Sequence, residues 1–183
     1  AIVVFPFYWM VNTSLKPASE IFVSPPTFVS PNWSIDAYIT VLTQRPVARY
    51  FLNSLVVALG TTLLSVTLAA FAAYGFTRFF PRGATPFIVF LLFTKMLPET
   101  LLIIPYFQLM SDLGLLNTYI ALILAYSSFA LPFSVWMLIG FFRSIPRDID
   151  EAAMIDGASY LQSFFRVILP LARPGLVAVA LFT

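Results

Sequence analysis

The sequence has 183 residues, of which 60% are hydrophobic and only 10% are charged, with a formal net charge of +2 and a mean hydropathy of +0.93. Soluble domains carry about 25% charged residues, so this composition indicates a membrane protein. The sequence contains no cysteine and no histidine, which excludes disulfides, thiol nucleophiles, histidine-based catalysis and the usual zinc sites. It also lacks the basic runs that track nucleic acid.

Apolar runs in chain order predict an all-α, polytopic transmembrane bundle, because a single segment in lipid must satisfy its own backbone hydrogen bonds. No charged residue lies between Arg49 and Arg78 or between Asp112 and Arg143, and each run exceeds the ~20 residues of a span. A third candidate span, about residues 85–110, is interrupted by Lys95, Pro98, Glu99 and Pro105. Residues 1–10 and the run from residue 175 read as partial spans. We therefore expect three full spans and two partial ones, in a segment truncated from a longer chain.

The segment from Ser14 to Arg49, between the first two spans, is rich in proline and serine. Three prolines rule out a continuous helix there: Pro25, Pro26 and Pro31. Residues 35–42 either form a short helix on the membrane surface, with Trp33 and Tyr38 at the interface, or belong to a plain connecting loop.

Lys and Arg residues indicate the orientation of the spans. The loops after the second and fourth spans share one side and contain six arginines: Arg78, Arg82, Arg143, Arg147, Arg166 and Arg173. The opposite side has Lys16, Arg45 and Arg49 over a longer stretch. The positive-inside rule therefore predicts that the arginine-rich loops are cytoplasmic.

The second of these loops contains the polar run IPRDIDEAAMIDGAS, which predicts a helix, a tight glycine turn and another helix. Pro146 suits a first helical position, and the acids that follow it suit a helix N-terminus. Gly157 stands where a left-handed residue ends a helix, Ser159 and Gln162 have capping-box spacing, and Pro170 is expected to stop the second helix.

One stripe of the first helix comprises Ile149, Ala152, Ala153 and Asp156, at i, i+3, i+4 and i+7 spacing. Small alanines beside an acid make a shallow surface that another protein can cover. A solvated loop helix with ordinary charges is the alternative that these residues leave open.

The pattern E-A-A-x-x-x-G-A, followed by an apolar segment and L-P, resembles the EAA loop of ABC importer permeases. Its matching residues are Glu151, Ala152, Ala153, Gly157, Ala158, Leu169 and Pro170. In maltose-type carbohydrate permeases, WMVNTSLKP resembles the end of the first core span and the start of the outer loop, YFLNSLVVALGTTLLSVTLAAFAAYGFTRF resembles the second core span, and GLLNTYIALIL resembles the start of the fourth. The resemblance covers nearly all of residues 1–183, and residues 143–173 correspond to the cytoplasmic EAA coupling loop. The family usually has six core spans, and Asp36 stands where it often has asparagine.

This resemblance implies a multi-pass subunit of the bacterial or archaeal cytoplasmic membrane that moves a sugar or related carbohydrate. It implies that Glu151, Ala152, Ala153, Asp156, Gly157 and Ala158 contact a cytoplasmic ATPase, with Glu151 meeting a basic group. It also implies a second permease subunit, a solute-binding protein, a carbohydrate substrate and membrane lipid as partners. No cofactor, metal or nucleic acid is expected. The sequence has no nucleotide-binding glycine loop, so we expect ATP to bind to the partner.

Candidate residues of the substrate pathway are Lys95, Glu99, Tyr126, Ser127, Phe129 and Trp136. Ionisable residues within spans are usually functional or paired, and sugar sites combine aromatic faces with hydroxyl groups. The alternatives are that Lys95 and Glu99 partner each other or water, and that the aromatic residues pack or face lipid.

Two further functions remain open from the sequence. A permease of the same type for a non-sugar solute has the same coupling loop, and a secondary transporter without an ATPase has an uncoupled one. An enzyme is not expected, because the acids cluster in a loop with no nucleophile or metal spacing.

Overall fold

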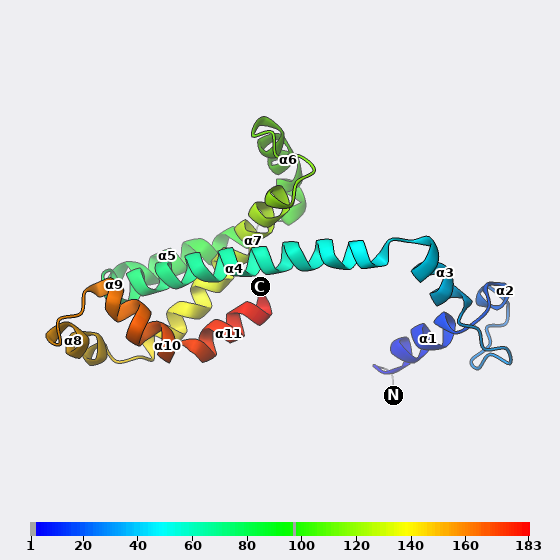
Figure 1. Ribbon diagram of the computed structural model, residues 1–183, viewed down its shortest axis with the longest axis horizontal. Helices are drawn as coiled ribbons and strands as arrows, with labels where there is room; N and C mark the ends of the chain where they lie inside the picture. Colours follow the sequence, from blue (N-terminus) through cyan, green and yellow to red (C-terminus); the bar gives the residue numbers. More distant parts are fainter. Residues whose placement is uncertain (1–2, 97) are drawn as a thin grey trace. The chain divides into compact units, whose positions relative to one another are not determined.

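The structure is a computed structural model that describes residues 3–96 and 98–183, and these residues form helices with no strand. The all-α prediction is confirmed. The chain divides into two units, residues 1–53 and residues 54–183 (Figure 1).

The first unit contains α1 (Phe5–Ser14), α2 (Ala18–Ile21) and α3 (Asp36–Gln44), joined by the proline-rich segment. Polar side chains fix this segment: Ser30 and Asn32 donate hydrogen bonds of 2.7 and 2.8 Å to the carboxylate of Glu20. These bonds, from Asn32 first and then Ser30, hold the pKa of Glu20 below its ordinary value. Of the two alternatives for residues 35–42, the structure has the short helix, which is α3.

Two helices are long and apolar enough to cross a membrane as single segments in the described part of the chain: α4 (Val47–Arg78) and α7 (Tyr119–Arg143). In the second unit, α4 buries a face of small residues that includes Ala69, Ala70 and Ala73. Small residues let spanning helices approach closely. Leu138, Ile139 and Phe142 of α7 belong to the same core.

The third expected span is broken into α5 (Pro81–Thr94), a 3-10 helix η1 (Glu99–Leu102) and α6 (Ile103–Asp112). None of these pieces alone reaches the length of a span. Pro98 precedes η1 and supplies no backbone donor, which explains why a continuous helix does not run through this region. The third candidate span, which the sequence shows to be interrupted by charged residues and prolines, is thus broken into separate helices.

After α7 the chain forms α8 (Arg147–Ile155), α9 (Tyr160–Ser163), a π-helix η2 (Phe164–Ile168), α10 (Leu169–Leu171) and α11 (Arg173–Phe182). Residues Tyr160–Leu171 and Arg173–Phe182 are together long and apolar enough to cross a membrane as one broken span. The two pieces meet at an angle of 74°. The helical path continues through Pro170 and breaks at Ala172, two residues later than expected. Proline at an early helical position needs no backbone N–H partner, so it does not stop α10.

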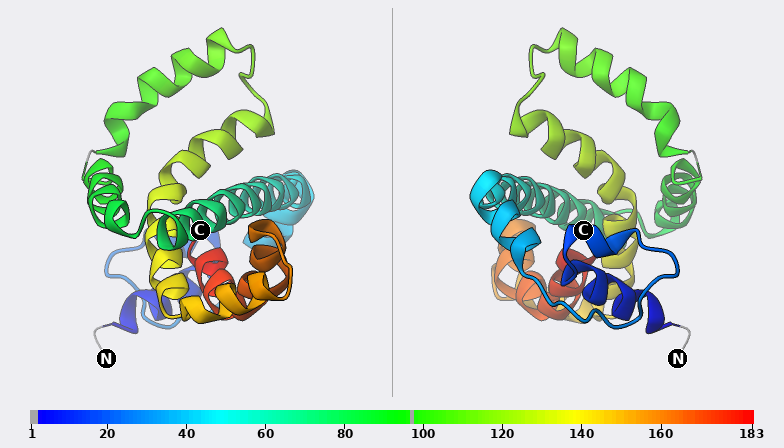
Figure 2. Two further views of the ribbon diagram at one scale, coloured as in Figure 1. Left: turned by 90° about the vertical axis from the view of Figure 1, so that its left-hand side faces the viewer. Right: turned by 90° about the vertical axis from the view of Figure 1, so that its right-hand side faces the viewer.

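Helices α8, α9 and α10 lie at the end of the second unit that holds the C-terminal end of α4 (Figure 1). Helix α11 packs beside α7, as both side views show (Figure 2). The polar loop is therefore folded against the ends of the two long helices rather than extended away from them.

Candidate functional site

Helix α8 begins one residue later than the sequence indicated, and it ends at the expected glycine turn. The sequence suggested Pro146 as the first helical residue, but Pro146 is the N-cap and Arg147 is the first helical residue. Its C-terminal turn closes through a hydrogen bond of 3.0 Å from the Ala158 N–H to the Ala153 carbonyl, while Gly157 has φ +87°. The left-handed glycine turn is thus confirmed.

The capping box is also confirmed at the start of α9. The Ser159 N–H donates to Gln162 Oε1 at 2.8 Å, and the Gln162 N–H donates to Ser159 Oγ at 3.3 Å. These bonds satisfy donors that a helix N-terminus leaves unpaired. The glycine turn and the capping box together fix how α8 joins α9.

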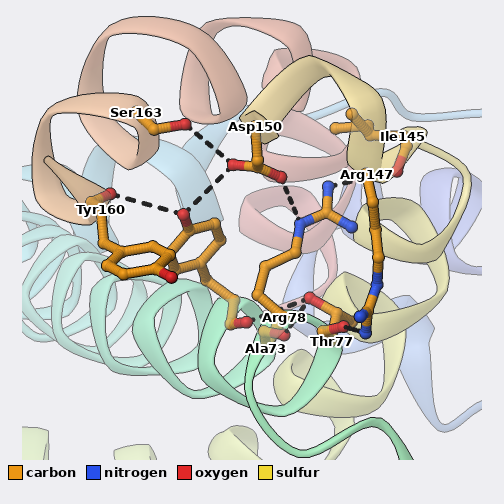
Figure 3. Close-up of polar contacts among 9 residues, drawn as sticks. Ala73, Thr77, Arg78, Ile145, Arg147, Asp150, Tyr160 and Ser163 are labelled. Atoms are coloured by element: carbon orange, nitrogen blue, oxygen red, sulfur yellow. Dashed lines mark hydrogen bonds and ion pairs between the residues drawn. The ribbon is translucent and has the colours of Figure 1, made fainter. Parts of the chain in front are cut away.

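The inner face of α8 carries a buried acid, Asp150, with an exposed fraction of only 4%. Its Oδ2 forms an ion pair of 2.6 Å with Nε of Arg78, at the last turn of α4. Its Oδ1 accepts hydrogen bonds from the Tyr74 hydroxyl at 3.2 Å and from Ser163 Oγ at 2.8 Å. Figure 3 shows these side chains converging from α4, α8 and α9. Oδ1 of the buried carboxylate is therefore hydrogen-bonded, and Oδ2 is compensated by the charge of Arg78 without a well-aligned hydrogen bond.

Two further arginine contacts join the ends of α4 and α7. Arg78 donates from an Nη atom to the Ile145 carbonyl at 3.1 Å. Arg147 donates from an Nη atom to the Thr77 carbonyl at 2.6 Å (Figure 3). The C-terminal carbonyls of helices lack intrahelical partners, and cations favour that end of the helix dipole. Arg147, in the chain that follows α7, thus binds a carbonyl in the last turn of α4, and Arg78, at the end of α4, binds a carbonyl just after α7.

Aromatic packing makes a second connection between the loop and α4. Phe164 of η2 is 1% exposed, and its ring centroid lies 4.9 Å from that of Tyr74 and 5.0 Å from that of Phe71. Aromatic pairs in this range contribute about 0.5–1.5 kcal/mol beyond area burial. The loop is therefore held to the same stretch of α4 both by the polar network around Asp150 and by the packing of Phe164.

The outer face of α8 comprises Asp148, Glu151, Ala152 and Ile155, which are exposed and have i, i+3, i+4 and i+7 spacing. Ile155 is 85% exposed. This face is rotated by one residue from the predicted stripe. Ile149 and Ala153, which belonged to that stripe, are half-buried, and Ile149 packs against the core.

The other predicted coupling residues lie at the end of α8. Asp156 and Gly157 are exposed, and Ala158 is half-buried. Sequence reasoning missed two features of this site, the buried face around Asp150 and the exposed Ile155. It placed Asp150 among the acids that suit a helix N-terminus, and it assigned Arg78 only to membrane orientation. One available signal was the i, i+4 spacing of Tyr74 and Arg78 at the end of an apolar helix.

The candidate residues of the substrate pathway whose side chains the structure describes do not form one cluster. Lys95 Nζ lies 5.6 Å from the ring centroid of Phe129, in the range of a cation–π contact. Ser127 is buried, whereas Tyr126 is 54% exposed. The side chain of Glu99 lies outside what the structure describes.

Trp136 lies in a different place, in a cavity of about 540 Å³ between α7 and α11. The lining is mostly aromatic: Phe133, Trp136, Met137, Gly140, Phe141, Ser144 and Phe182. Lys95 and Phe129 are thus in contact with each other, whereas Trp136 lines this separate cavity.

Comparisons with known proteins agree with the fold. A family model described as binding-protein-dependent transport system inner membrane component matches residues 65–183. The chain is 41% identical, over 99% of its length and 60% of the relative's, to the diacetylchitobiose uptake system permease protein NgcG of Streptomyces coelicolor. It is 36% identical to the trehalose/maltose transport system permease protein MalG of Thermococcus litoralis, over 98% of this chain and 65% of that one.

A solved structure is similar to the chain over 99% of its length, with a TM-score of 0.79 and 24% identity. It belongs to a bacterial ABC transporter involved in the import of the acidic polysaccharide alginate, and 63% of that chain is covered. At 24% identity, this structural similarity establishes the fold of the chain. The chain spans about 60% of the length of these relatives.

Proposed function

Because the chain belongs to the family of binding-protein-dependent transport system inner membrane components, we propose that its parent protein imports a carbohydrate and that α8 couples this transport to ATP hydrolysis. As an inner membrane component, the chain is a subunit of a transport system rather than an enzyme. The named relatives transport diacetylchitobiose and trehalose or maltose, which supports the carbohydrate assignment. A permease for another solute is the alternative.

The observation that carries the coupling proposal is the two-faced character of α8. Its inner face is held to the end of α4 by the ion pair between Asp150 and Arg78. Its outer face presents Glu151, Ala152 and an 85% exposed Ile155 to solvent. An exposed isoleucine contributes nothing to a helix that is only solvated. An apolar side chain with charged residues around it is typical of a docking surface, which has an apolar centre and a polar rim.

We assign the docking partner as a cytoplasmic ATPase subunit. Ile155 enters an apolar socket, and Glu151 meets a basic group that fixes the register of the contact. When the ATPase moves, α8 moves with it because its outer face is bound to the ATPase. The closed turn at Gly157 and Ala158 passes this movement on to α9. The ion pair of Asp150 and the packing of Phe164 then transmit the movement to α4.

The remaining partners follow from the same assignment. They are a second permease subunit, an extracytoplasmic solute-binding protein, a carbohydrate and membrane lipid. Lys95 and Phe129 are the strongest pair for the substrate pathway, because a cation over an aromatic face offers both polar and stacking contacts to a sugar. Glu99, Tyr126, Ser127 and Trp136 stay candidates for other points of that pathway.

The test uses the full-length parent protein with its ATPase. Ile155→Ser and Glu151→Ala remove the apolar and charged parts of the outer face without touching the buried face. We expect normal amounts in the membrane, weak co-purification of the ATPase and loss of solute uptake. Loss of one charge-assisted contact weakens ATPase binding by about 1.5–3 kcal/mol.

The matched control is Leu161→Ser, because Leu161 is 63% exposed and belongs to α9 rather than to the outer face of α8. It should retain both ATPase binding and uptake. Normal binding and uptake in Ile155→Ser and Glu151→Ala would overturn the coupling assignment. A fall in membrane abundance for both variants would instead show that they serve the fold.

A further inference from the structure

A small pocket lies where the C-terminal ends of α4 and α7 meet the start of α8. It has a volume of about 200 Å³ and is lined by Thr77, Arg78, Arg143, Ile145, Pro146 and Arg147. Three of these residues are arginines that come from three different helices. The pocket is next to the Asp150 network but separate from the outer face of α8.

The pocket has an excess of positive charge. Asp150 neutralises Arg78 through the ion pair of 2.6 Å. In the described part of the chain, Arg143 and Arg147 form no ion pair, and the contact of Arg147 is with a neutral carbonyl, that of Thr77. Asp148, the acid next to Arg147 in the sequence, is exposed and makes no ion pair either. Two guanidinium groups therefore face the pocket without a compensating carboxylate.

The ends of α4 and α7 would normally disfavour an anion, since helix C-termini carry partial negative charge. Here Arg147 donates to the Thr77 carbonyl and Arg78 donates to the Ile145 carbonyl, which offsets that charge. A guanidinium has five N–H donors, so these contacts leave donors available on both arginines. The fork of an arginine side chain also matches the oxygens of a phosphate group.

The pocket lies at the charged ends of the two helices that are long and apolar enough to cross a membrane. The apolar stretches of α4 and α7 end at Arg78 and Arg143. Lipid phosphates occupy the layer just beyond the hydrocarbon, and basic pockets between spanning helices on the cytoplasmic side bind anionic headgroups. A volume of about 200 Å³ is below the ~300–1,000 Å³ of pockets for drug-sized ligands, so a headgroup phosphate fits better than a nucleotide.

We propose that this pocket binds the phosphate of an anionic phospholipid headgroup of the inner membrane. Arg143 and Arg147 hold the phosphate, and Arg78 connects the pocket to α8 through its ion pair with Asp150. The proposal needs only membrane insertion, so it stands or falls separately from the assignment of α8 as a coupling helix.

The experiment uses the purified full-length parent in nanodiscs or mixed micelles that contain phosphatidylglycerol, with phosphatidylcholine as the neutral comparison. Lipid retained by the protein is measured by native mass spectrometry, and thermal stability is measured alongside. We expect selective retention of phosphatidylglycerol and a higher thermal midpoint. Arg143→Gln should lower phosphatidylglycerol affinity by about tenfold, the loss expected for one charge-assisted hydrogen bond.

Arg147→Gln provides a second variant, and Arg173→Gln provides the matched control. Arg173 is exposed at the start of α11 and does not line the pocket. The control should retain the lipid, whereas Arg143→Gln and Arg147→Gln should lose it. Arg78 is left unchanged because its removal breaks the ion pair.

Inorganic phosphate, added without anionic lipid, distinguishes the two sources of the same chemistry. A thermal shift with millimolar phosphate, abolished by Arg143→Gln, would mean that the pocket binds a free anion, and the lipid assignment would be wrong. Equal retention of phosphatidylglycerol by Arg143→Gln, Arg147→Gln and Arg173→Gln would overturn the site altogether.

Discussion

Arg78 in the last turn of α4 and Asp150 in the first turn of α8 form an ion pair in which both side chains are less than a tenth exposed. Removing one partner from such a pair leaves an uncompensated buried charge and costs about 3–5 kcal/mol. We therefore expect Arg78→Gln and Asp150→Asn each to lower the thermal midpoint of the purified full-length protein strongly.

The double variant Arg78→Gln with Asp150→Asn is the informative control, because it removes both charges. It should be more stable than the sum of the two single losses predicts, since residues in one ion-pair network are not additive. Strictly additive losses would show that the two charges do not stabilise each other in the folded protein.

Gly157 has φ +87°, and a Cβ added at this position meets no atom within 4 Å. Any loss in Gly157→Val therefore arises from backbone strain rather than from a clash. A left-handed conformation costs a residue with a Cβ about 1–2 kcal/mol. We expect Gly157→Val to displace the turn and to lower uptake, and Gly157→Asn to be tolerated better, because asparagine enters this conformation more readily.

Gly140 provides the comparison for this prediction. It lies in α7, and a Cβ there also meets nothing within 4 Å. Because alanine favours a helix interior by up to about 1 kcal/mol over glycine, Gly140→Ala should be neutral or stabilising. Equal thermal midpoints for Gly140→Ala and Gly157→Val would contradict the strain argument.

The sequence predicted those parts of the site that depend on neighbouring residues. The turn at Gly157 and the capping box of Ser159 and Gln162 are set by short-range hydrogen bonds, so spacing alone predicts them. The family resemblance, the all-α fold and the inner-membrane location are likewise confirmed.

The buried network required the fold. Arg78 and Asp150 are far apart in the chain, and no local spacing indicates that a charge at a helix end is paired rather than solvated. The side of α8 that faces solvent was misjudged by one residue for the same reason. Helical periodicity defines the stripes of a helix, but it does not say which stripe packs against α4 and which remains exposed.

Gly60 of α4 allows a close approach to α7. A Cβ at this position would lie 2.5 Å from Cδ1 and 3.0 Å from Cγ1 of Ile123. Overpacking of this kind costs about 1–3 kcal/mol, which outweighs the gain of up to about 1 kcal/mol from replacing glycine by alanine inside a helix, so Gly60→Ala should lower the thermal midpoint. Ile123→Val removes the nearest methyl group, so the double variant Gly60→Ala with Ile123→Val should recover much of the loss. A double variant less stable than Gly60→Ala alone would show that this contact does not limit the approach of the helices.

The orientation of the chain can be tested with single cysteines, because residues 1–183 contain none and any cysteine elsewhere in the full-length parent is first replaced by serine. Ile155 on α8 is 85% exposed and Phe22 in the first unit is 93% exposed, so a thiol at either position is accessible to a reagent. The arginine-rich loops are predicted to be cytoplasmic. In intact cells that express the full-length parent, a membrane-impermeant thiol reagent should therefore label Phe22→Cys and should leave Ile155→Cys unlabelled. Permeabilisation should then expose Ile155→Cys, provided that the ATPase has been removed from the outer face of α8. Labelling of Ile155→Cys but not of Phe22→Cys in intact cells would invert the topology, and α8 would then lie on the wrong side of the membrane to meet an ATPase.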